Sequence, residues 1–600
     1  MDRIHQHRDI SAIGARGRFP RRLRESLALL MQSIYPEHDV QNLVEQALAA
    51  YWPLGEEPRP RARSLATTLW NENDSYVITY ADTFISGKHK PLDLLDDFLR
   101  SYLDGTISGV HILPYFPSTS DDGFAVTDYY AVNSSVGSWE DIGRVCEHFT
   151  LMSDLVINHC SSQSRMFNEY LQARAPYQDF FFEASPQDDL SMVVRPRAHP
   201  LLREVETANG TKHVWCTFSH DQVDFNFSNP QVLFEFLRII RFHISKGVRT
   251  FRLDAIAFLW KEVGTSCVHL RQTHEIVRLL RLLADYSTEP LVLISETNVP
   301  SLENLSYFGN RNEAHVVYNF SLPPLLLHAL LTGTSRHLNA WQMTMPPAPL
   351  GCAYFNFTAS HDGIGVRPAE GFLSDSQIDQ MIETTSRFGG RVSLRDMPSG
   401  HTRPYEINIS LFEALKGTAK GEDGWNVERF LCSQTIAMAL EGIPGFYVHS
   451  LLATPNDLEA VETAGYNRAI NRHRWHYPDL VDLLADPSSI HSIVFAAIRR
   501  MIRIRSRQPA FHPNATQFTL QLGDAIFGFW RQSIDRAQSI FAVHNLTDDN
   551  VSIPTMSLNL IGGEQWIDLI SGEEIVAFDG SIDFAPYQCR WITNRQPTQR

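Results

Sequence analysis

Long apolar runs, a secretory leader and an excess of positive charge are all missing from this sequence. No stretch reaches the roughly 18 apolar residues of a membrane span, so we expect no transmembrane helix. The first residues are charged without an apolar segment behind them, so we expect no secretory signal. Lys and Arg number 52 against 68 Asp and Glu, a net charge of -16, which argues against a nucleic acid or a membrane as partner.

Paired cysteines and nucleotide-binding loops are also missing. The seven cysteines stand singly, without a CxxC pair, so we expect reduced thiols in a cytoplasmic protein. The glycine-containing segment 389–396 does not match a phosphate-cradling or dinucleotide fingerprint. We therefore predict no nucleotide cofactor.

Alternation of strands and helices predicts the fold class. Eight short β-rich runs between residues 75 and 450 alternate with helical segments, which is typical of an α/β fold of the (β/α)8 TIM-barrel type. Several runs are almost wholly apolar, as strands buried on both faces should be. Towards the C-terminus short alternating strands predict a separate all-β domain.

The chain is too long for a single hydrophobic core, so we expect several domains. Two inserted segments follow strand C-termini and should overhang the catalytic face. The predicted order is a helical extension at 1–70, barrel parts at 71–158, 229–363 and 417–505, an inserted domain B at 159–228, an inserted loop domain B′ at 364–416 and the β domain at 506–600. The extension covers part of the barrel or makes a dimer contact; a homodimer is left open.

Carboxylates and histidines end several of the predicted strands. His159, Asp254, Glu296 and the pair His361–Asp362 each follow an apolar run. Polar residues at these strand ends point into the active site of a TIM barrel. A single Asp in such a place is usually a helix N-cap, but four such sites in chain order favour an active site.

Two of these carboxylates suit retaining glycoside chemistry, which places them about 5 Å apart. Arg252 lies two residues before Asp254 and therefore on the same side of the strand. Such an arginine holds the aspartate ionised, which makes Asp254 the nucleophile with a low pKa. Glu296 has no basic neighbour in sequence and is the general acid/base with a raised pKa.

Five ordered segments resemble the signature regions of the α-amylase superfamily, glycoside hydrolase family 13. They are GVHILPYFPSTSDDGFAVTDY, DLVINH, FRLDAIAF, ISETN and SHDGIGVRP. Within the family they resemble the sucrose phosphorylase branch. The N-terminal extension and the segments ETNVPSLENLSYFG and RPYEINISLFEAL are most similar to its glucosylglycerate and glucosylglycerol phosphorylases. The resemblance implies a retaining α-glucoside phosphorylase, an enzyme that forms a covalent glucosyl intermediate and yields α-glucose 1-phosphate.

The resemblance also implies roles for individual residues. Asp254 would be the nucleophile, Glu296 the acid/base, and Asp362 would stabilise the oxocarbenium-like state. The donor glucose would be bound by Asp121, Phe124, His159, Phe218, Arg252, His361 and Arg468. Phe124 and Phe218 could equally be ordinary core residues. Many α-amylases hold calcium near the positions of Asp154 and Asn158, but this branch generally lacks the site, so we predict no metal.

Inorganic phosphate, the second substrate, needs a basic pocket. Arg197 matches the phosphate-contacting arginine of sucrose phosphorylase. His401, Arg403 and Tyr405 lie on the second insertion, which by resemblance moves between phosphate-bound and acceptor-bound states. The alternative for these loop residues is a solvated surface.

The acceptor positions depart from the sucrose phosphorylase pattern. Asn298 stands where those enzymes have His, Glu406 where they have Gln, and Phe258 where they usually have Tyr. A short polyol or hydroxy acid therefore fits better than fructose, and glucosylglycerate or glucosylglycerol is favoured. The alternatives are a sucrose or sucrose 6′-phosphate phosphorylase, a family 13 hydrolase or transglucosidase, and a non-catalytic barrel.

Overall fold

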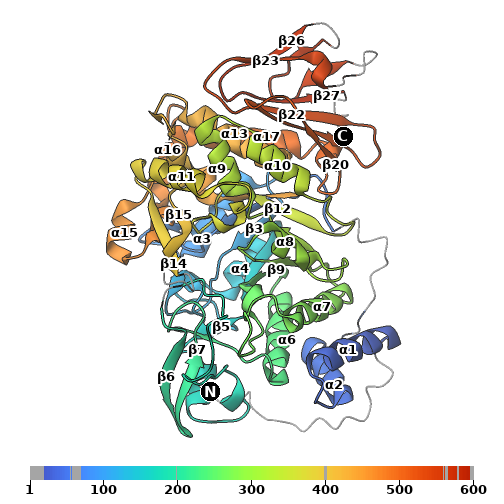
Figure 1. The fold of residues 1–600 in the computed structure, drawn as a ribbon, viewed down its shortest axis with the longest axis vertical. Coiled ribbons are helices and arrows are strands. Elements are labelled where there is room, and N and C mark those ends of the chain that lie inside the picture. Colours follow the sequence, from blue (N-terminus) through green and yellow to red (C-terminus); the bar gives the residue numbers. More distant parts are fainter. Residues whose placement is uncertain are drawn as a thin grey trace.

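The computed structural model describes residues 19–53, 69–197, 199–396, 402–558, 565–576 and 580–594, together with Glu56, Pro58 and Leu560. At its centre eight parallel strands close into a barrel and follow one another around it in chain order (Figure 1). They are β1 (Tyr76–Thr79), β3 (Gly109–Ile112), β4 (Thr150–Val156), β9 (Val248–Asp254), β10 (Val292–Ser295), β11 (Val316–Tyr318), β12 (Ala353–Phe357) and β18 (Ile443–Tyr447). The predicted (β/α)8 barrel is confirmed, and each predicted run contributes one strand.

Burial on both faces explains why these runs form barrel strands. Every residue of β1, β3, β11, β12 and β18 is buried, so neither face needs polar side chains. The helices that surround or cap the barrel include α3 (Pro91–Phe98), α4 (Trp139–His148), α6 (Pro230–Ser245), α7 (Arg271–Asp285), α8 (Ser301–Leu305), α9 (Leu322–Thr332), α10 (Arg336–Thr344), α13 (Asn426–Ala439), α16 (Tyr477–Ala485) and α17 (Ile490–Arg505). Among the described residues no single helix is long and apolar enough to cross a membrane, and α16 with α17 meets that test only as a pair bent by 74°.

Two insertions extend from the barrel. Between β4 and β9 the chain forms α5 (Arg165–Leu171), the hairpin of β6 (Leu202–Thr207) with β7 (Gly210–Trp215), and the antiparallel pair β5 (His159–Ser161) and β8 (Gln222–Asp224). Between β12 and β18 it forms α11 (Asp375–Arg387) and a sheet in the order β13 (Ile364–Gly365), β15 (Thr402–Asn408), β14 (Arg391–Asp396). Both insertions start at the carboxyl ends of barrel strands, where they wall the site described below.

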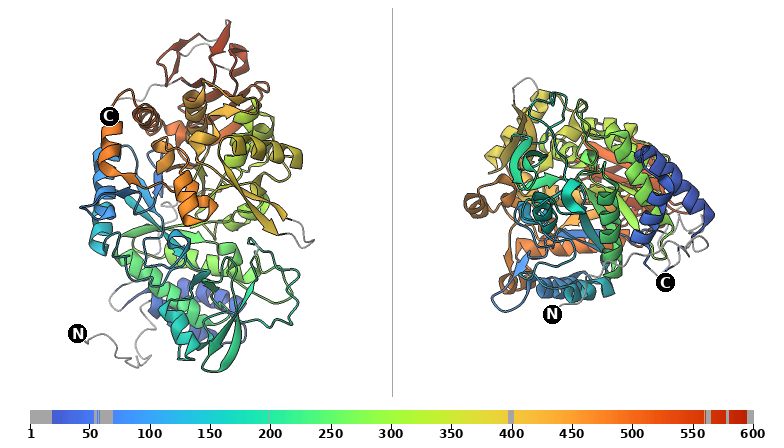
Figure 2. Two further views of the ribbon diagram at one scale, coloured as in Figure 1. Left: turned by 90° about the vertical axis from the view of Figure 1, so that its left-hand side faces the viewer. Right: turned by 90° about the horizontal axis from the view of Figure 1, so that it is seen from below.

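The C-terminal part is rich in strands, as predicted, and lies at the opposite end of the molecule from β6 and β7 (Figure 2). Its main sheet has the order β20 (Thr516–Leu520), β21 (Ile526–Gln532), β22 (Ser539–Asn545), β27 (Cys589–Thr593), β24 (Trp566–Asp568), β25 (Glu574–Ile575). A second sheet pairs β23 (Val551–Pro554) with β26 (Ser581–Phe584). Arg531, buried in β21, donates to the carbonyl oxygen of Ala439 at 2.7 Å and so ties the sheet to the end of α13.

An N-terminal helical hairpin packs on the outside of the barrel. Its helix α1 (Arg21–Ile34) lies on α7, and α2 (Val40–Tyr51) lies on α6 (Figure 1). Tyr35 donates to the carbonyl oxygen of Phe227 at 3.0 Å, and the hydroxyls of Tyr51 and Ser287 are 2.7 Å apart. The described part of the extension therefore covers two barrel helices.

Candidate active site

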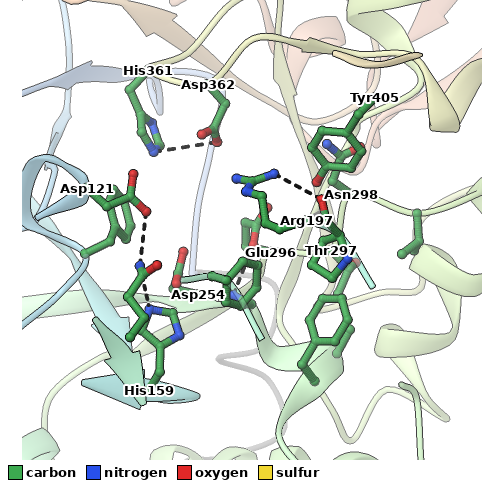
Figure 3. Close-up of a pocket in the computed structure, with 18 of the residues that line it drawn as sticks. Asp121, His159, Arg197, Asp254, Glu296, Thr297, Asn298, His361, Asp362 and Tyr405 are labelled. Atoms are coloured by element: carbon green, nitrogen blue, oxygen red, sulfur yellow. Dashed lines mark hydrogen bonds and ion pairs between the residues drawn. The ribbon is translucent and has the colours of Figure 1, made fainter. Parts of the chain in front are cut away.

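One pocket lies at the carboxyl ends of the barrel strands, where TIM-barrel sites are built. Asp254 ends β9, Glu296 directly follows β10, and His361 and Asp362 follow β12. Most residues predicted from sequence line this pocket: Asp121, Phe124, His159, Arg197, Phe218, Arg252, Asp254, Glu296, Asn298, His361, Asp362, Tyr405 and Arg468. Figure 3 shows Asp254 on the same side as Asp121, His159, His361 and Asp362, Asn298 and Tyr405 on the other side, and Glu296 and Arg197 between them.

Arg252 links the two central carboxylates. Its Nη1 donates to Asp254 Oδ1 at 2.8 Å, and its Nη2 lies 3.8 Å from Glu296 Oε1. A third carboxylate, Asp154, also contacts this guanidinium and is in turn 2.7 Å from His111 Nε2. Glu296 Oε2 accepts the backbone N–H of Ala255 at 3.1 Å. The two carboxylates are thus held at one guanidinium in one pocket.

Burial raises the pKa of Glu296 above its ordinary value, although Arg252 opposes the shift. This is the direction predicted for a general acid. The low pKa predicted for Asp254 is wrong, because burial raises it well above the ordinary value and Glu296 and Asp154 add to that, against Arg252. Two buried carboxylates share one guanidinium, so ionisation of one raises the pKa of the other.

The half of the pocket around Asp362 is built from paired groups. Arg468 Nη1 lies 2.5 Å from Asp362 Oδ1, and His361 Nε2 lies 3.6 Å from Asp362 Oδ2. Burial alone would raise the pKa of Asp362, but Arg468 and His361 hold it below its usual range. Phe124 stacks on the ring of His361, with centroids 5.2 Å apart. Asp362 is therefore an ionised carboxylate beside an aromatic wall, a setting suited to sugar hydroxyls.

The opposite half carries a cation beside an aromatic ring. The guanidinium carbon of Arg197 lies 5.3 Å from the centre of the Tyr405 ring. Asn298 reaches the same region, and its Oδ1 is buried without a hydrogen-bond partner. A Cβ at Gly365 would lie 2.7 Å from the amide atoms of Asn298, so a larger residue there would have to displace this side chain. The ring centroid of Phe218 lies 5.2 Å from that of His159 and 5.5 Å from that of Phe258. Phe218 and Phe258 both line the pocket.

Two predicted acceptor or phosphate residues are not at the pocket. Glu406 is buried, and both its carboxylate oxygens accept hydrogen bonds from Arg468, at 2.8 and 2.9 Å. It therefore positions Arg468 and has no oxygen turned to an acceptor. Arg403 is half-exposed and donates to Asp375 at 2.7 Å, away from the pocket. His401 lies outside the described residues.

Sequence reasoning missed three polar residues that line the pocket, Gln222, Thr297 and Arg367. Gln222 donates to Asp121 Oδ2 at 3.1 Å and lies 3.2 Å from His159 Nε2. Thr297 and Arg367 were contained in the ISETN and SHDGIGVRP segments but were not singled out. Gln222 carries no local signal, because its partners are 63 and 101 residues away in the chain.

Asn158, one of the two residues named for a calcium site that we predict to be absent, contacts a lysine. Lys261 Nζ donates to Asn158 Oδ1 at 2.7 Å and lies 2.8 Å from Asp224 Oδ2. All three side chains are buried, and Asn158 also donates to Asp224 at 2.9 Å. Within the described ranges no group of three or more His, Cys, Asp or Glu side chains is arranged to hold a metal ion.

Comparison with known proteins decides the family. The model of the α-amylase catalytic domain matches residues 101–345. A glucosylglycerate phosphorylase of Spirochaeta thermophila is 42% identical over 531 residues, which cover 87% of this chain and 90% of that protein. The chain belongs to the glucoside phosphorylases of the α-amylase superfamily. It is therefore an enzyme, and the resemblance noted from its motifs is confirmed.

More distant members of this superfamily are similar over most of the chain as well. A glucosylglycerol phosphorylase of Marinobacter adhaerens is 30% identical over 455 residues, 73% of this chain and 88% of that protein. The crystal structure of sucrose 6F-phosphate phosphorylase from Thermoanaerobacter thermosaccharolyticum matches with a TM-score of 0.70 and 24% identity, over 84% of this chain and 97% of that one. At this identity the structural match concerns the fold alone.

Proposed function

We propose that this phosphorylase is a retaining glucosylglycerate phosphorylase, which transfers glucose from glucosylglycerate to inorganic phosphate and releases α-glucose 1-phosphate and glycerate. The observation that carries the proposal is the pair Asp254 and Glu296 at Arg252, with a further arginine, Arg197, beside Tyr405 in the same pocket. The identity to the glucosylglycerate enzyme, 42% against 30% for the glucosylglycerol enzyme, favours the acidic acceptor.

The first half of the reaction uses both central carboxylates. Asp254 attacks C1 of the glucosyl unit while Glu296 gives its proton to the glycosidic oxygen. The bond from C1 to that oxygen breaks, glycerate leaves, and glucose is held as an ester of Asp254. Burial, which keeps the pKa of Glu296 above its ordinary value, supports its role as the proton donor.

The second half restores the enzyme. A phosphate oxygen attacks C1, its proton passes to Glu296, and the ester bond to Asp254 breaks. Two displacements at C1 retain the α configuration. Asp362, ionised between Arg468 and His361, is placed to hold the sugar hydroxyls and to face the positive charge that develops at C1.

Phosphate-dependent release of glucose 1-phosphate tests this proposal. Glucosylglycerate, glucosylglycerol, sucrose and sucrose 6′-phosphate are incubated in parallel with and without phosphate, and glucose 1-phosphate and glucose are measured. We expect the highest kcat/KM with glucosylglycerate and glucose 1-phosphate as the product. Equal release of free glucose with and without phosphate would identify a hydrolase, and preference for another substrate would overturn the choice of acceptor.

The location that we propose for the enzyme is the cytoplasm. All seven cysteines are described and none forms a disulfide, and most of them are buried. This supports a reducing compartment.

A further inference from the structure

Arg367 is a second arginine of the pocket that no role discussed so far uses. It begins the 3-10 turn Arg367–Ala369 directly after β13, in the loop between Asp362 and α11. It lines the pocket together with Arg197, Asn298 and Tyr405, and it is only partly exposed. Its positive charge therefore lies at the pocket, and the question is which group neutralises it.

The arginines around the donor half are neutralised by carboxylates. Arg252 is paired with Asp254, and Arg468 is paired with Asp362 and Glu406. For Arg367, by contrast, no described carboxylate lies within ion-pair distance, and its Nε is buried without a hydrogen-bond partner. Glu370, the acidic residue nearest in sequence, is paired with another arginine, Arg395, at 2.8 Å.

Arg197 also lacks a carboxylate partner among the described residues. Its contacts are the ring of Tyr405 and, at 3.4 Å, the carbonyl oxygen of the preceding Pro196, with no described carboxylate within 4 Å. Both side chains are only partly exposed, so an anion that enters the pocket gains charge-assisted hydrogen bonds from guanidinium groups that no described carboxylate neutralises. Two such arginines in one pocket of a chain with net charge -16 indicate a site built for an anion.

The proposed reaction brings two anions to this half in turn. The glycosidic oxygen that leaves and the phosphate oxygen that enters both lie beside Glu296, on the side of C1 away from Asp254. The carboxylate of glycerate and the charged oxygens of phosphate are attached to those oxygens and must therefore occupy the same half. A neutral acceptor such as glycerol would make no use of a guanidinium there.

We propose that Arg367 and Arg197 form one anion site that binds the carboxylate of glycerate and inorganic phosphate alternately, an inference that rests on the proposed function. The planar guanidinium forks suit both anions, which present paired oxygens. Asn298, whose Oδ1 is buried without a partner, accepts a hydrogen bond from a hydroxyl of glycerate. The acceptor is thus recognised by its charge at the arginines and by its hydroxyl at Asn298.

Transfer from α-glucosyl fluoride tests the site, because this donor forms the glucosyl enzyme by releasing only a small fluoride ion and leaves the acceptor half free for the acceptor that is added. KM and kcat are measured for transfer to glycerate, to phosphate and to glycerol in the parent, Arg367→Gln and Arg367→Lys. The matched control is Arg395→Gln, which changes an arginine of the same insertion that already has Glu370 as its partner. Transfer to glycerol in each variant reports whether the pocket is still folded.

In Arg367→Gln the ratio of kcat/KM for glycerate to that for glycerol should fall by about tenfold or more, the scale of one lost charge-assisted hydrogen bond. The ratio of phosphate to glycerol should fall by a similar factor, Arg367→Lys should lose less, and Arg395→Gln should stay within about twofold of the parent. Unchanged ratios in Arg367→Gln, or a fall for one anion alone, would overturn the shared site. A parent enzyme that transfers to phosphate but not to glycerate would instead overturn the proposed function, and the two failures are therefore distinguishable.

Discussion

Replacing Glu406 by Gln tests which of two roles this carboxylate has. It either positions Arg468 or binds the acceptor directly. Both oxygens of Glu406 accept hydrogen bonds from Arg468, and the side chain is buried. Gln keeps one oxygen, so one charge-assisted hydrogen bond is lost and Asp362 becomes the only described carboxylate paired with Arg468. Such a bond contributes about 1.5–3 kcal/mol. If the whole of this free energy is lost from the stabilisation of the transition state, kcat/KM falls by about 10- to 150-fold.

The assay compares acceptors at one donor. With α-glucosyl fluoride and either glycerate, glycerol or phosphate, the loss in Glu406→Gln should be similar for all three, because Arg468 contacts Asp362 in the donor half. Glu413→Gln, which removes a partly exposed pair with Lys416, is the control and should change little. A loss confined to glycerate and glycerol, with phosphate transfer intact, would refute the positioning role and return Glu406 to the acceptor site.

Three further predictions concern the same pocket. Arg197→Ala should raise the KM for phosphate about tenfold or more while slow hydrolysis persists, and an unchanged phosphate dependence would remove Arg197 from the site. The active form has one proton on the pair Asp254 and Glu296, so kcat/KM should be bell-shaped in pH. Because burial raises the pKa of both carboxylates, the acid limb of the profile should lie above the ordinary aspartate pKa of 3.8. An acid limb at or below that value would contradict the raised pKa. Gly365→Ala should lower transfer to glycerate, since its Cβ displaces Asn298 at a strain of about 1–3 kcal/mol; the loss should disappear when measured in an Asn298→Ala background.

Local pattern was enough to predict the barrel and the presence of Asp254 and Glu296 in one pocket. Apolar runs such as β1 and β12 signal strands without reference to the rest of the chain. The two-residue period of a strand placed Arg252 beside Asp254, and the structure has that contact at 2.8 Å. The strand-end rule of TIM barrels brought Glu296 into the same pocket.

What the sequence could not predict depends on residues far apart in the chain. The pairing of Glu406 with Arg468 joins residues 62 positions apart in the chain, so local reasoning cannot predict it. The raised pKa of Asp254 follows from burial by the assembled barrel, which outweighs the neighbouring Arg252. Arg367 lies inside the SHDGIGVRP segment, but the absence of an acidic partner among the described residues is visible only in three dimensions.

Trapping the glucosyl enzyme tests the central claim most directly. Glu296→Gln is incubated with α-glucosyl fluoride, which needs no proton to leave, in the absence of phosphate, and the digested protein is analysed by mass spectrometry. We predict one hexosyl unit, carried by Asp254 and released as α-glucose 1-phosphate when phosphate is added. A label on another residue, or a β-configured product formed without any label, would contradict the double displacement at Asp254.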